Sequence, residues 1–380
     1  MFIGYPNNIN TKYLHYNLHL YYYVNKGEFM NVVIFLGAGA SASENLPTQD
    51  EIFLRYFKSL SQEEYFNENN ISLINFLKYV FNIDILEYKD NIDHIKFPTF
   101  EEVFGILELA QSKDEYFRNL DISSKDKKYS ISYIKDIVVN VIIQILIHDN
   151  YKCNKYHDIL VQNLYKENLL ESVSFISCNY DNHIEKAIIN LNKQYDINYK
   201  INYGVDICSN NSINILKLHG SLNWLYCPIC NDINIEHLYD KNKLNIIDYK
   251  HKCINCNSDI HPIIIPPTYD KKTNNIFINM VWFKAEKLLL NTDLLIFTGY
   301  SFSDADMDIK YLIKKAQLNN KHNFDIYVIN DFKGKNEYEL QNEENRYSRF
   351  LGPKVKFIHK SFQELATDPK KVLYDNNILS

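Results

Sequence analysis

Short apolar, β-branched segments alternate with helical stretches along most of the chain, and this alternation limits the folds open to it. The first such segment, NVVIFL at Asn31–Leu36, ends in the glycine-rich sequence GAGAS. Further strand signals follow at residues 172–176, 213–218, 262–265, 294–298, 324–329 and 354–358, with helical stretches at 182–192, 275–290, 305–318 and 361–367. Strands that alternate with helices predict an α/β fold built on a doubly wound parallel sheet.

One long segment without strand signals interrupts this alternation. Residues 60–170 carry apolar side chains at helical spacing, for example Phe100, Phe104 and Leu107, and contain almost no glycine. This pattern predicts a helical insertion. The sheet core is then expected in three parts, at residues 31–59, 171–224 and 262–365. A cysteine-rich module at residues 225–261 would separate the last two parts, and residues 366–380 would form a tail.

Residues 1–30 differ in character from the rest of the chain. They are rich in Tyr, Asn and His, show no sustained periodicity and end at Met30, directly before the first strand signal. The codons that can encode Lys26–Phe29 include a purine-rich ribosome-binding sequence. One interpretation therefore takes Met30 as the natural start and the preceding residues as a leader that is not part of the natural protein. The alternative is a genuine N-terminal arm, and the sequence favours neither.

Glycine and polar residues follow several of the expected strands at the point where each strand ends. The segments are GAGAS at 37–41, CNYD at 178–181, LHGS at 218–221, GYS at 299–301 and the single residue Asn330. The carboxyl ends of parallel strands are where such sheets bind ligands. Glycines at 37 and 39 allow backbone conformations closed to other residues and let a pyrophosphate approach the start of the helix. We therefore expect a nucleotide site at this edge of the sheet.

Each of these segments also has a simpler interpretation when it is taken alone. A glycine turn serves any tight connection between strand and helix, Asp181 caps the helix that follows it, and His219 is a buried structural histidine. In the functional interpretation, His219 is a general base or orients a ribose hydroxyl. Helix capping would explain the presence of Asp181 but not that of Asn179. The segments therefore indicate a binding site only when they are considered together.

Two cysteine pairs form the most specific local pattern. Cys227-x-x-Cys230 and Cys253-x-x-Cys256 are separated by 22 residues. Pairs at this spacing predict a zinc ribbon in which four thiolates hold Zn²⁺ tetrahedrally. Four thiolates leave no open coordination position, so this metal is expected to be structural and not catalytic.

Charge and hydropathy exclude several classes of protein. Lys and Arg number 41 against 47 Asp and Glu, a net charge of −6, which argues against a broad surface for nucleic acid. Only four residues are arginine, so backbone N–H groups are expected to hold any phosphate. No apolar run reaches the roughly 18 residues of a membrane span, and no signal peptide is apparent. Cysteines in a metal pattern favour a reducing cytoplasm.

Taken in order, these segments resemble the sirtuin (Sir2) family, and specifically its divergent bacterial branch of phage-defence proteins. CNYD stands where the family has N-I-D, and the matching segments span residues 31 to about 332. The resemblance implies a Rossmann-like domain that binds NAD⁺ as its substrate. It also implies a smaller module, made of the zinc ribbon and the helical insertion, in which Zn²⁺ is structural.

The resemblance implies roles for individual residues. Asn179 would orient water or the nicotinamide ribose, and His219 would act as general base or orient a hydroxyl, so these two are the catalytic candidates. The expected NAD⁺-binding residues are Gly37, Ala38, Gly39, Ser41, Asp181, Gly299, Ser301 and Asn330. The expected zinc ligands are Cys227, Cys230, Cys253 and Cys256.

Two departures from the family pattern decide which activity we expect. The segment that pairs with an acyl-lysine peptide in the deacylases is replaced by residues 262–271, and Asn45–Thr48 stands where the family has Asp-Phe-Arg. We therefore expect an NAD⁺ glycohydrolase that releases nicotinamide and ADP-ribose and depletes NAD⁺ during abortive infection by phage. The alternatives are an NAD-dependent protein deacylase and a non-catalytic module that binds NAD or ADP-ribose.

An enzyme that depletes NAD⁺ is toxic and must be restrained until it is needed. Since the chain has no obvious sensor domain beyond about residue 365, we expect control through a homo-oligomer or a partner protein. A HerA-type ATPase is one such defence partner. Neither nucleic acid nor membrane is expected to bind the chain directly.

Overall fold

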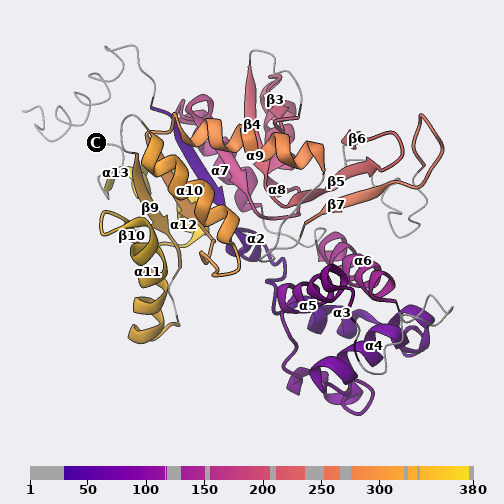
Figure 1. The fold of residues 1–380 in the computed structure, drawn as a ribbon. Helices are drawn as coiled ribbons and strands as arrows, with labels where there is room; N and C mark the ends of the chain where they lie inside the picture. Colours follow the sequence, from indigo (N-terminus) through magenta and orange to yellow (C-terminus); the bar gives the residue numbers. More distant parts are fainter. Residues whose placement is uncertain are drawn as a thin grey trace, which may run out of the picture.

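The structure is a computed structural model, and it describes residues 30–115, 117, 130–149, 155–205, 211–235, 252–265, 275–320, 324–331 and 334–375 (Figure 1). The leader predicted at residues 1–30 lies outside the described residues except for Met30.

A seven-stranded parallel sheet forms the centre of the protein, which confirms the predicted α/β class. Its strand order is β10-β9-β8-β1-β2-β4-β3. The register aligns the ends of the three central strands, because Leu36 of β1 pairs with Ser177 of β2 and with Thr298 of β8. The strands are β1 (Val32–Leu36), β2 (Val173–Ser177), β3 (Lys200–Asn202), β4 (Ser212–Lys217), β8 (Leu294–Thr298), β9 (Asp325–Ile329) and β10 (Lys356–Ile358).

Helices cover both faces of this sheet, as a doubly wound fold requires. Val32, Ile34 and Leu36 of β1 point to one face, and Val33 and Phe35 point to the other, so each face has its own hydrophobic core. The helices on the first face are α7 (Tyr156–Lys166), α8 (His183–Tyr195), α12 (Phe362–Thr367) and α13 (Pro369–Asp375). The helices on the second face are α9 (Ile276–Leu289), α10 (Met307–Asn319) and α11 (Glu337–Leu351).

A separate group of helices has a hydrophobic core of its own and lies beside the end of the sheet at which α2 (Ala38–Ala42) is found (Figure 1). A capping box between Thr99 and Glu102 starts one of these helices. The helices of the group are α3 (Ile52–Ser59), α4 (Glu68–Phe81), α5 (Phe100–Lys113) and α6 (Ile131–Asp149), with short 3₁₀ turns at η1 (Glu64–Phe66) and η2 (Lys89–His94).

A small antiparallel sheet of order β6-β5-β7 lies beside the large sheet, on the side of β4 and β3, and above the helical group in the view of Figure 1. Its strands are β5 (Gly220–Cys227), β6 (Asp232–Ile235) and β7 (His261–Ile264). The strand signal at 262–265 is therefore real, but its assignment to the parallel core is wrong, because β7 pairs with β5.

The hydrophobic cores show how the helices next to the predicted domain boundaries pack. Helix α3 packs in the core of the helical group, and α7 packs on the large sheet against α8, although both were placed on the other side of the predicted boundaries. The predicted tail contains α13, whose Val372 and Leu373 are buried in the core of the first face. The domain boundaries from the sequence stay a prediction.

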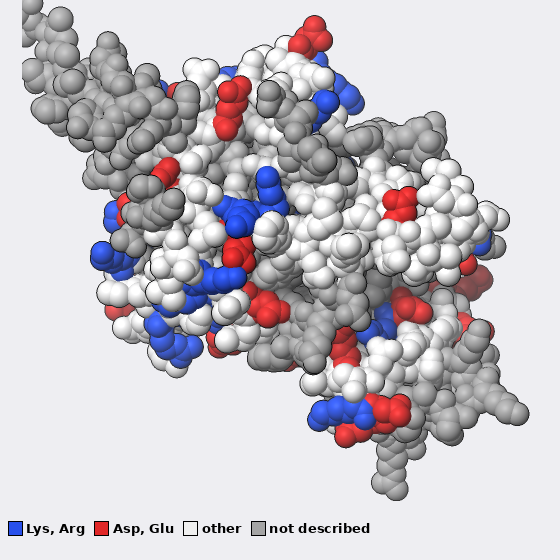
Figure 2. Space-filling model, turned by 45° about the horizontal axis from the view of Figure 1, so that its top comes forward, with Lys and Arg blue, Asp and Glu red and all other residues white. Residues whose placement is uncertain are grey.

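The part of the chain that the structure describes contains no helix that is long and apolar enough to span a membrane. On the face in Figure 2, Lys and Arg side chains are interspersed with Asp and Glu among uncharged residues.

Candidate functional site

A cavity of about 610 Å³ lies across the carboxyl ends of five strands of the large sheet. A residue just after each of these strands lines it: Ala38 (β1), Asn179 (β2), His219 (β4), Gly299 (β8) and Asn330 (β9). The chain leaves β1 toward β2 on one side and returns as β8 on the other, so the cavity lies at the topological switch point. Open α/β sheets bind their ligands in this position.

The two glycine turns pack directly against each other. Gly39 N donates a 2.7 Å hydrogen bond to the carbonyl oxygen of Gly299. A Cβ on Gly37 would lie 2.5 Å from the same carbonyl oxygen, and Gly299 itself adopts φ +64°. The expected reason for glycine at position 37 was room for a pyrophosphate. The structure gives a further reason, since a side chain there would separate the turns.

Asn179 is held from beneath by a short series of hydrogen bonds. Its Nδ2 donates to the carbonyl oxygen of Gly37 (2.9 Å) and to Oγ of Ser41 (3.0 Å). Ser41 Oγ in turn donates to Asp181 Oδ2 (2.7 Å). Both amide protons of Asn179 are thereby used, and because Asn179 lines the cavity, its Oδ1 is the atom suited to accept a hydrogen bond from a ligand.

Asp181 is the charged end of this series. Burial opposes its ionisation, but the neighbouring His183, Lys217 and His157, together with the Ser41 hydroxyl, hold the pKa of the Asp181 carboxyl well below its usual range. Asp181 Oδ1 also accepts a hydrogen bond from the backbone N–H of His183 (3.1 Å), the first residue of α8, whose N-cap residue is Asn182.

A buried ion pair fixes the turn that carries Asn179. Lys217 at the end of β4 has a fully buried side chain that lies 3.2 Å from Oε1 of Glu185, which is 1% exposed. Lys217 Nζ also donates to the backbone carbonyl of Asp181. The ion pair therefore links β4, which leads into His219, to α8, and the hydrogen bond to Asp181 links it to the turn that contains Asn179.

His219 lies at the same end of the cavity and is 3% exposed. Its Nε2 is 3.8 Å from Oδ1 of Asp306, whose Oδ2 accepts a hydrogen bond from the hydroxyl of Tyr300 (2.8 Å). Burial and the charge of Asp306 raise the pKa of Tyr300 well above its usual value, so this hydroxyl stays protonated and orients Asp306. A histidine beside a fixed carboxylate is suited to accept a proton.

Asn330 organises the opposite end of the cavity. Its Oδ1 accepts from the backbone N–H of Gly299 (2.7 Å), and its Nδ2 donates to the carbonyl of Tyr300 (3.1 Å) and to Glu343 (3.1 Å). Lys335 forms an ion pair with the same Glu343. The contacts of Asn330 in the structure are thus to the second glycine turn and to α11.

Carboxylates predominate in the charged lining. The described residues include one lysine, Lys335, and no arginine, against five acidic residues: Asp50, Glu101, Asp306, Asp331 and Glu343. Glu101 belongs to α5 and Asp50 precedes α3, so the helical group forms one wall of the cavity. An acidic lining favours a ligand whose reacting part carries positive charge.

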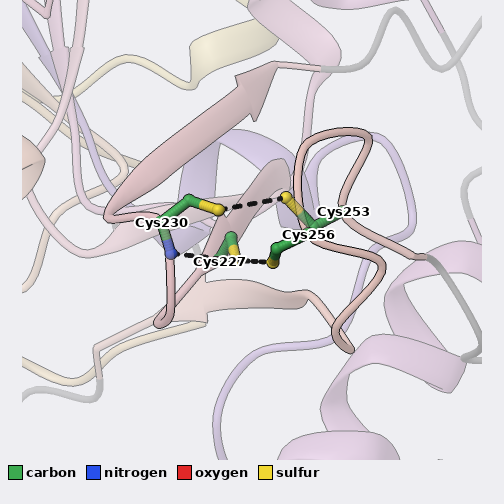
Figure 3. Close-up of side chains that lie close together, drawn as sticks. All are labelled: Cys227, Cys230, Cys253 and Cys256. Carbon is green, nitrogen blue, oxygen red and sulfur yellow. Dashed lines mark hydrogen bonds between the residues drawn. The ribbon is translucent and has the colours of Figure 1, made fainter.

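The four cysteines converge at one end of the small sheet (Figure 3). Cys227 and Cys256 have their sulfur atoms 3.6 Å apart, and those of Cys230 and Cys253 are 3.8 Å apart. Four thiolates at about 2.3 Å from a tetrahedral Zn²⁺ are separated by about 3.8 Å. The residues present therefore fit Zn²⁺, and the four-cysteine prediction is compatible with a structural metal.

The structure brings most of the predicted site residues together. Seven of them line the cavity: Ala38, Gly39, Asn179, His219, Gly299, Ser301 and Asn330. Gly37, Ser41 and Asp181 do not line it and lie beneath it, where they support Asn179. Sequence reasoning assigned no role to Tyr300, Asp306, Lys217 or Glu185. The available signal for Asp306 was its position, because it lies shortly after the GYS turn and directly before a helix.

Fold and site together define an α/β protein with a ligand cavity at the switch point of its sheet and a separate four-cysteine module. Residues 173–350 match the model of the SIR2-like domain family. Residues 173–350 therefore contain a SIR2-like domain, as the resemblance of the motifs predicted. No curated protein matches it in sequence.

Several solved Sir2 structures are similar to the chain at low sequence identity. A Sir2 homologue in complex with NAD is 15% identical, with 92% of this chain and 91% of that chain covered and a TM-score of 0.45. A Sir2 complex with a p53 peptide and NAD⁺ is 14% identical, with 92% and 94% covered and a TM-score of 0.43. A Sir2 homologue variant with ADP-ribose is 14% identical, with the same coverage and a TM-score of 0.42.

Proposed function

We propose that the protein hydrolyses NAD⁺ at the nicotinamide–ribose bond and releases nicotinamide and ADP-ribose. The observation that carries the proposal is a cavity at the switch point with Asn179 and His219 at one end and Asn330 at the other. The adenosine half would lie near Gly299, Ser301 and Asn330, and the pyrophosphate would lie over the first glycine turn. The nicotinamide ribose then reaches Asn179 and His219.

The side chains at that end are suited to hydrolysis. Asn179 Oδ1, the group left over by its two donated hydrogen bonds, accepts from the attacking water or from a ribose hydroxyl. The bond from C1′ to the nicotinamide nitrogen breaks, and its electron pair neutralises the pyridinium. The water oxygen bonds to C1′, and its proton passes to His219. Carboxylates such as Asp306 and Glu101 stabilise the positive charge that develops on the ribose.

The burial of His219 favours water over a peptide as the acceptor. The residue is 3% exposed, and its backbone carbonyl accepts a hydrogen bond from Ile265 N (2.9 Å). The carbonyl of Ile265 in turn accepts from the Tyr180 hydroxyl (2.8 Å), whose ring centroid is 6.4 Å from that of His219. These contacts hold residue 265 against one side of His219, and they support the proposal that water, and not a peptide, is the acceptor.

The test is to incubate the protein with NAD⁺, with and without an acetyl-lysine peptide, and to measure nicotinamide and ADP-ribose by chromatography. We expect release without peptide, and its loss in Asn179→Ala and in His219→Ala. The matched controls are Asn319→Ala on α10 and His359→Ala, which change the same residue types on the surface and should retain turnover. Turnover that requires the peptide, or full activity in both site variants, would refute the proposal.

We further propose that this activity is the NAD⁺-depleting effector of a bacterial anti-phage system and operates in the cytoplasm. The replaced peptide-binding segment and the four metal-type cysteines support this. Because NAD⁺ depletion is toxic, control by a homo-oligomer or by a partner such as a HerA-type ATPase belongs to the same proposal. Expression with and without the neighbouring gene, followed by phage challenge and measurement of cellular NAD⁺, tests it.

A further inference from the structure

Three buried side chains from separate segments meet beneath the floor of the cavity. Glu44 follows α2, His157 lies in the first turn of α7 and His183 begins α8. Their side chains are 3–4% exposed, and one donor atom from each lies within 4.8 Å of the other two. They are close to the cavity without lining it, since Phe362, whose ring centroid is 4.7 Å from that of His157, is a lining residue.

Both histidines present a ring nitrogen to the same carboxylate. Glu44 Oε1 lies 2.8 Å from Nδ1 of His157, and Glu44 Oε2 contacts Nδ1 of His183. Ligands at about 2.0–2.2 Å from one metal ion are separated from each other by about 3–3.5 Å. A small outward movement of the three side chains therefore converts their mutual contacts into a coordination sphere.

The balance of buried charge favours a cation at this place. Lys217 is paired with Glu185, which leaves the carboxylates of Glu44 and Asp181 beside two imidazoles. One divalent cation held by neutral imidazoles balances both carboxylates. Without a cation, neutral imidazoles that donate Nδ1–H to Glu44 leave both carboxylate charges uncompensated, and two imidazolium rings with centroids 5.5 Å apart repel each other in a buried site.

We propose that Glu44, His157 and His183 form a second metal site that takes a divalent first-row cation such as Zn²⁺. Two imidazoles and one carboxylate are a common protein ligand set for such ions. The ion would tie the segment after α2 to the starts of α7 and α8. Ser41 and Asp181, which support Asn179, belong to the segments joined in this way, so the role is structural.

The experiment measures the metal content of untagged, full-length protein by inductively coupled plasma mass spectrometry. We expect two equivalents per chain. A thiol-modifying reagent should release one equivalent, from the four cysteines, and the second should be released only on denaturation. Zinc K-edge absorption of the wild-type protein should show nitrogen or oxygen neighbours in addition to sulfur.

Matched variants assign the second equivalent. His157→Gln and Glu44→Gln should each lose it and keep the thiol-released metal, whereas His359→Gln, at an exposed histidine, should keep both. A single equivalent of first-row metal in folded wild-type protein overturns the proposal without reference to any variant. So does a second equivalent that persists in both His157→Gln and Glu44→Gln.

Discussion

The contact between the two glycine turns yields a prediction whose size follows from the structure. In Gly299→Ala, the new Cβ would lie 2.0 Å from the backbone nitrogen of Ala40, and the residue would keep φ +64°. The left-handed conformation costs about 1–2 kcal/mol. Relief of the overlap requires the turns to separate by more than about 1 Å, which breaks the hydrogen bond from Gly39 to Gly299 at a cost of about 1–3 kcal/mol. We expect a total loss of about 2–5 kcal/mol in the free energy of unfolding.

Two other glycines separate the contributions. Gly352 has φ +98° and open space within 4 Å of the position a Cβ would take, so Gly352→Ala tests backbone strain alone and should cost about 1–3 kcal/mol. Gly105 lies inside α5 with the same free space, and alanine there should stabilise the protein by about 0.5–1 kcal/mol. Glycine-to-alanine substitution is therefore predicted to lower the free energy of unfolding at positions 299 and 352 and to raise it at position 105.

Urea unfolding gives the stabilities, and calorimetric titration with ADP-ribose, which lacks the bond to be cleaved, gives the effect on the site. Gly299→Ala should bind ADP-ribose at least about tenfold more weakly, a loss of about 1.4 kcal/mol. Gly105→Ala should bind it as the wild type does. A Gly299→Ala protein as stable as the wild type, with unchanged affinity, would show that the turns do not depend on this contact.

Three further predictions concern the buried charges, the histidine and the cysteines. Lys217→Met should destabilise the protein by about 3–5 kcal/mol in urea unfolding, because Glu185 is left buried without its partner. The double variant Lys217→Met with Glu185→Met should recover part of that loss. Additive effects of the two substitutions would contradict the ion pair. Asp306→Asn should lower kcat for NAD⁺ hydrolysis by up to about 100-fold while ADP-ribose affinity holds, since it removes the charge beside His219; equal kcat values would exclude that role. Cys256→Ser should lose one zinc equivalent and expose the 225–261 module to proteolysis before the sheet melts, and unchanged zinc content would count against the four-cysteine site.

The central strands of the large sheet were predictable because they are buried on both faces and read as continuous apolar runs. The edge strand β3, which is three residues long and has one buried residue, was not predicted. Residues 294–298 coincide with β8, and β2, β4, β9 and β10 differ from their predicted ranges by a few residues at most. Helix α11 was not predicted, because only Glu343, Tyr347 and Leu351 are buried along its 15 residues. Its capping box, Asn336 with Glu339, was the available signal.

Strand β5 was not predicted either, for a different reason. Seven of its eight residues are buried, including the polar Ser221 and Asn223, so no alternation of polar and apolar residues marks it. Strand β5 begins at Gly220, inside the LHGS segment. The sequence places this segment at the end of β4, but it also contains the start of β5. Without β5, the pairing partner of residues 261–264 was invisible, and those residues were assigned to the wrong sheet.

Some residues of the candidate site were predictable from local sequence, whereas others are identified only by contacts between distant segments. Residues at strand ends were predictable from local sequence, because topology alone brings those ends to one edge. The hydrogen-bond partners of these residues were not predictable. Asn179 donates to Ser41, which is 138 residues away, and Lys217 donates to the backbone carbonyl of Asp181, which no side-chain motif indicates. Glu44, His157 and His183 lie in three segments that carry no common motif, so only the folded chain places them together.

The motifs therefore act on one another as much as on a ligand. The carbonyl of Gly37 accepts from the Asn179 amide, and Ser41 joins Asn179 to Asp181. Gly299 donates its N–H to Asn330, and its carbonyl accepts from Gly39 in the first glycine turn. A substitution in one motif must then be felt at the others. Ser41→Ala and Asp181→Asn interrupt the same series of hydrogen bonds, so their combined effect on turnover should be much smaller than the product of their separate effects. Independent effects would mean that Ser41 and Asp181 each contact the ligand directly, as the family resemblance first implied.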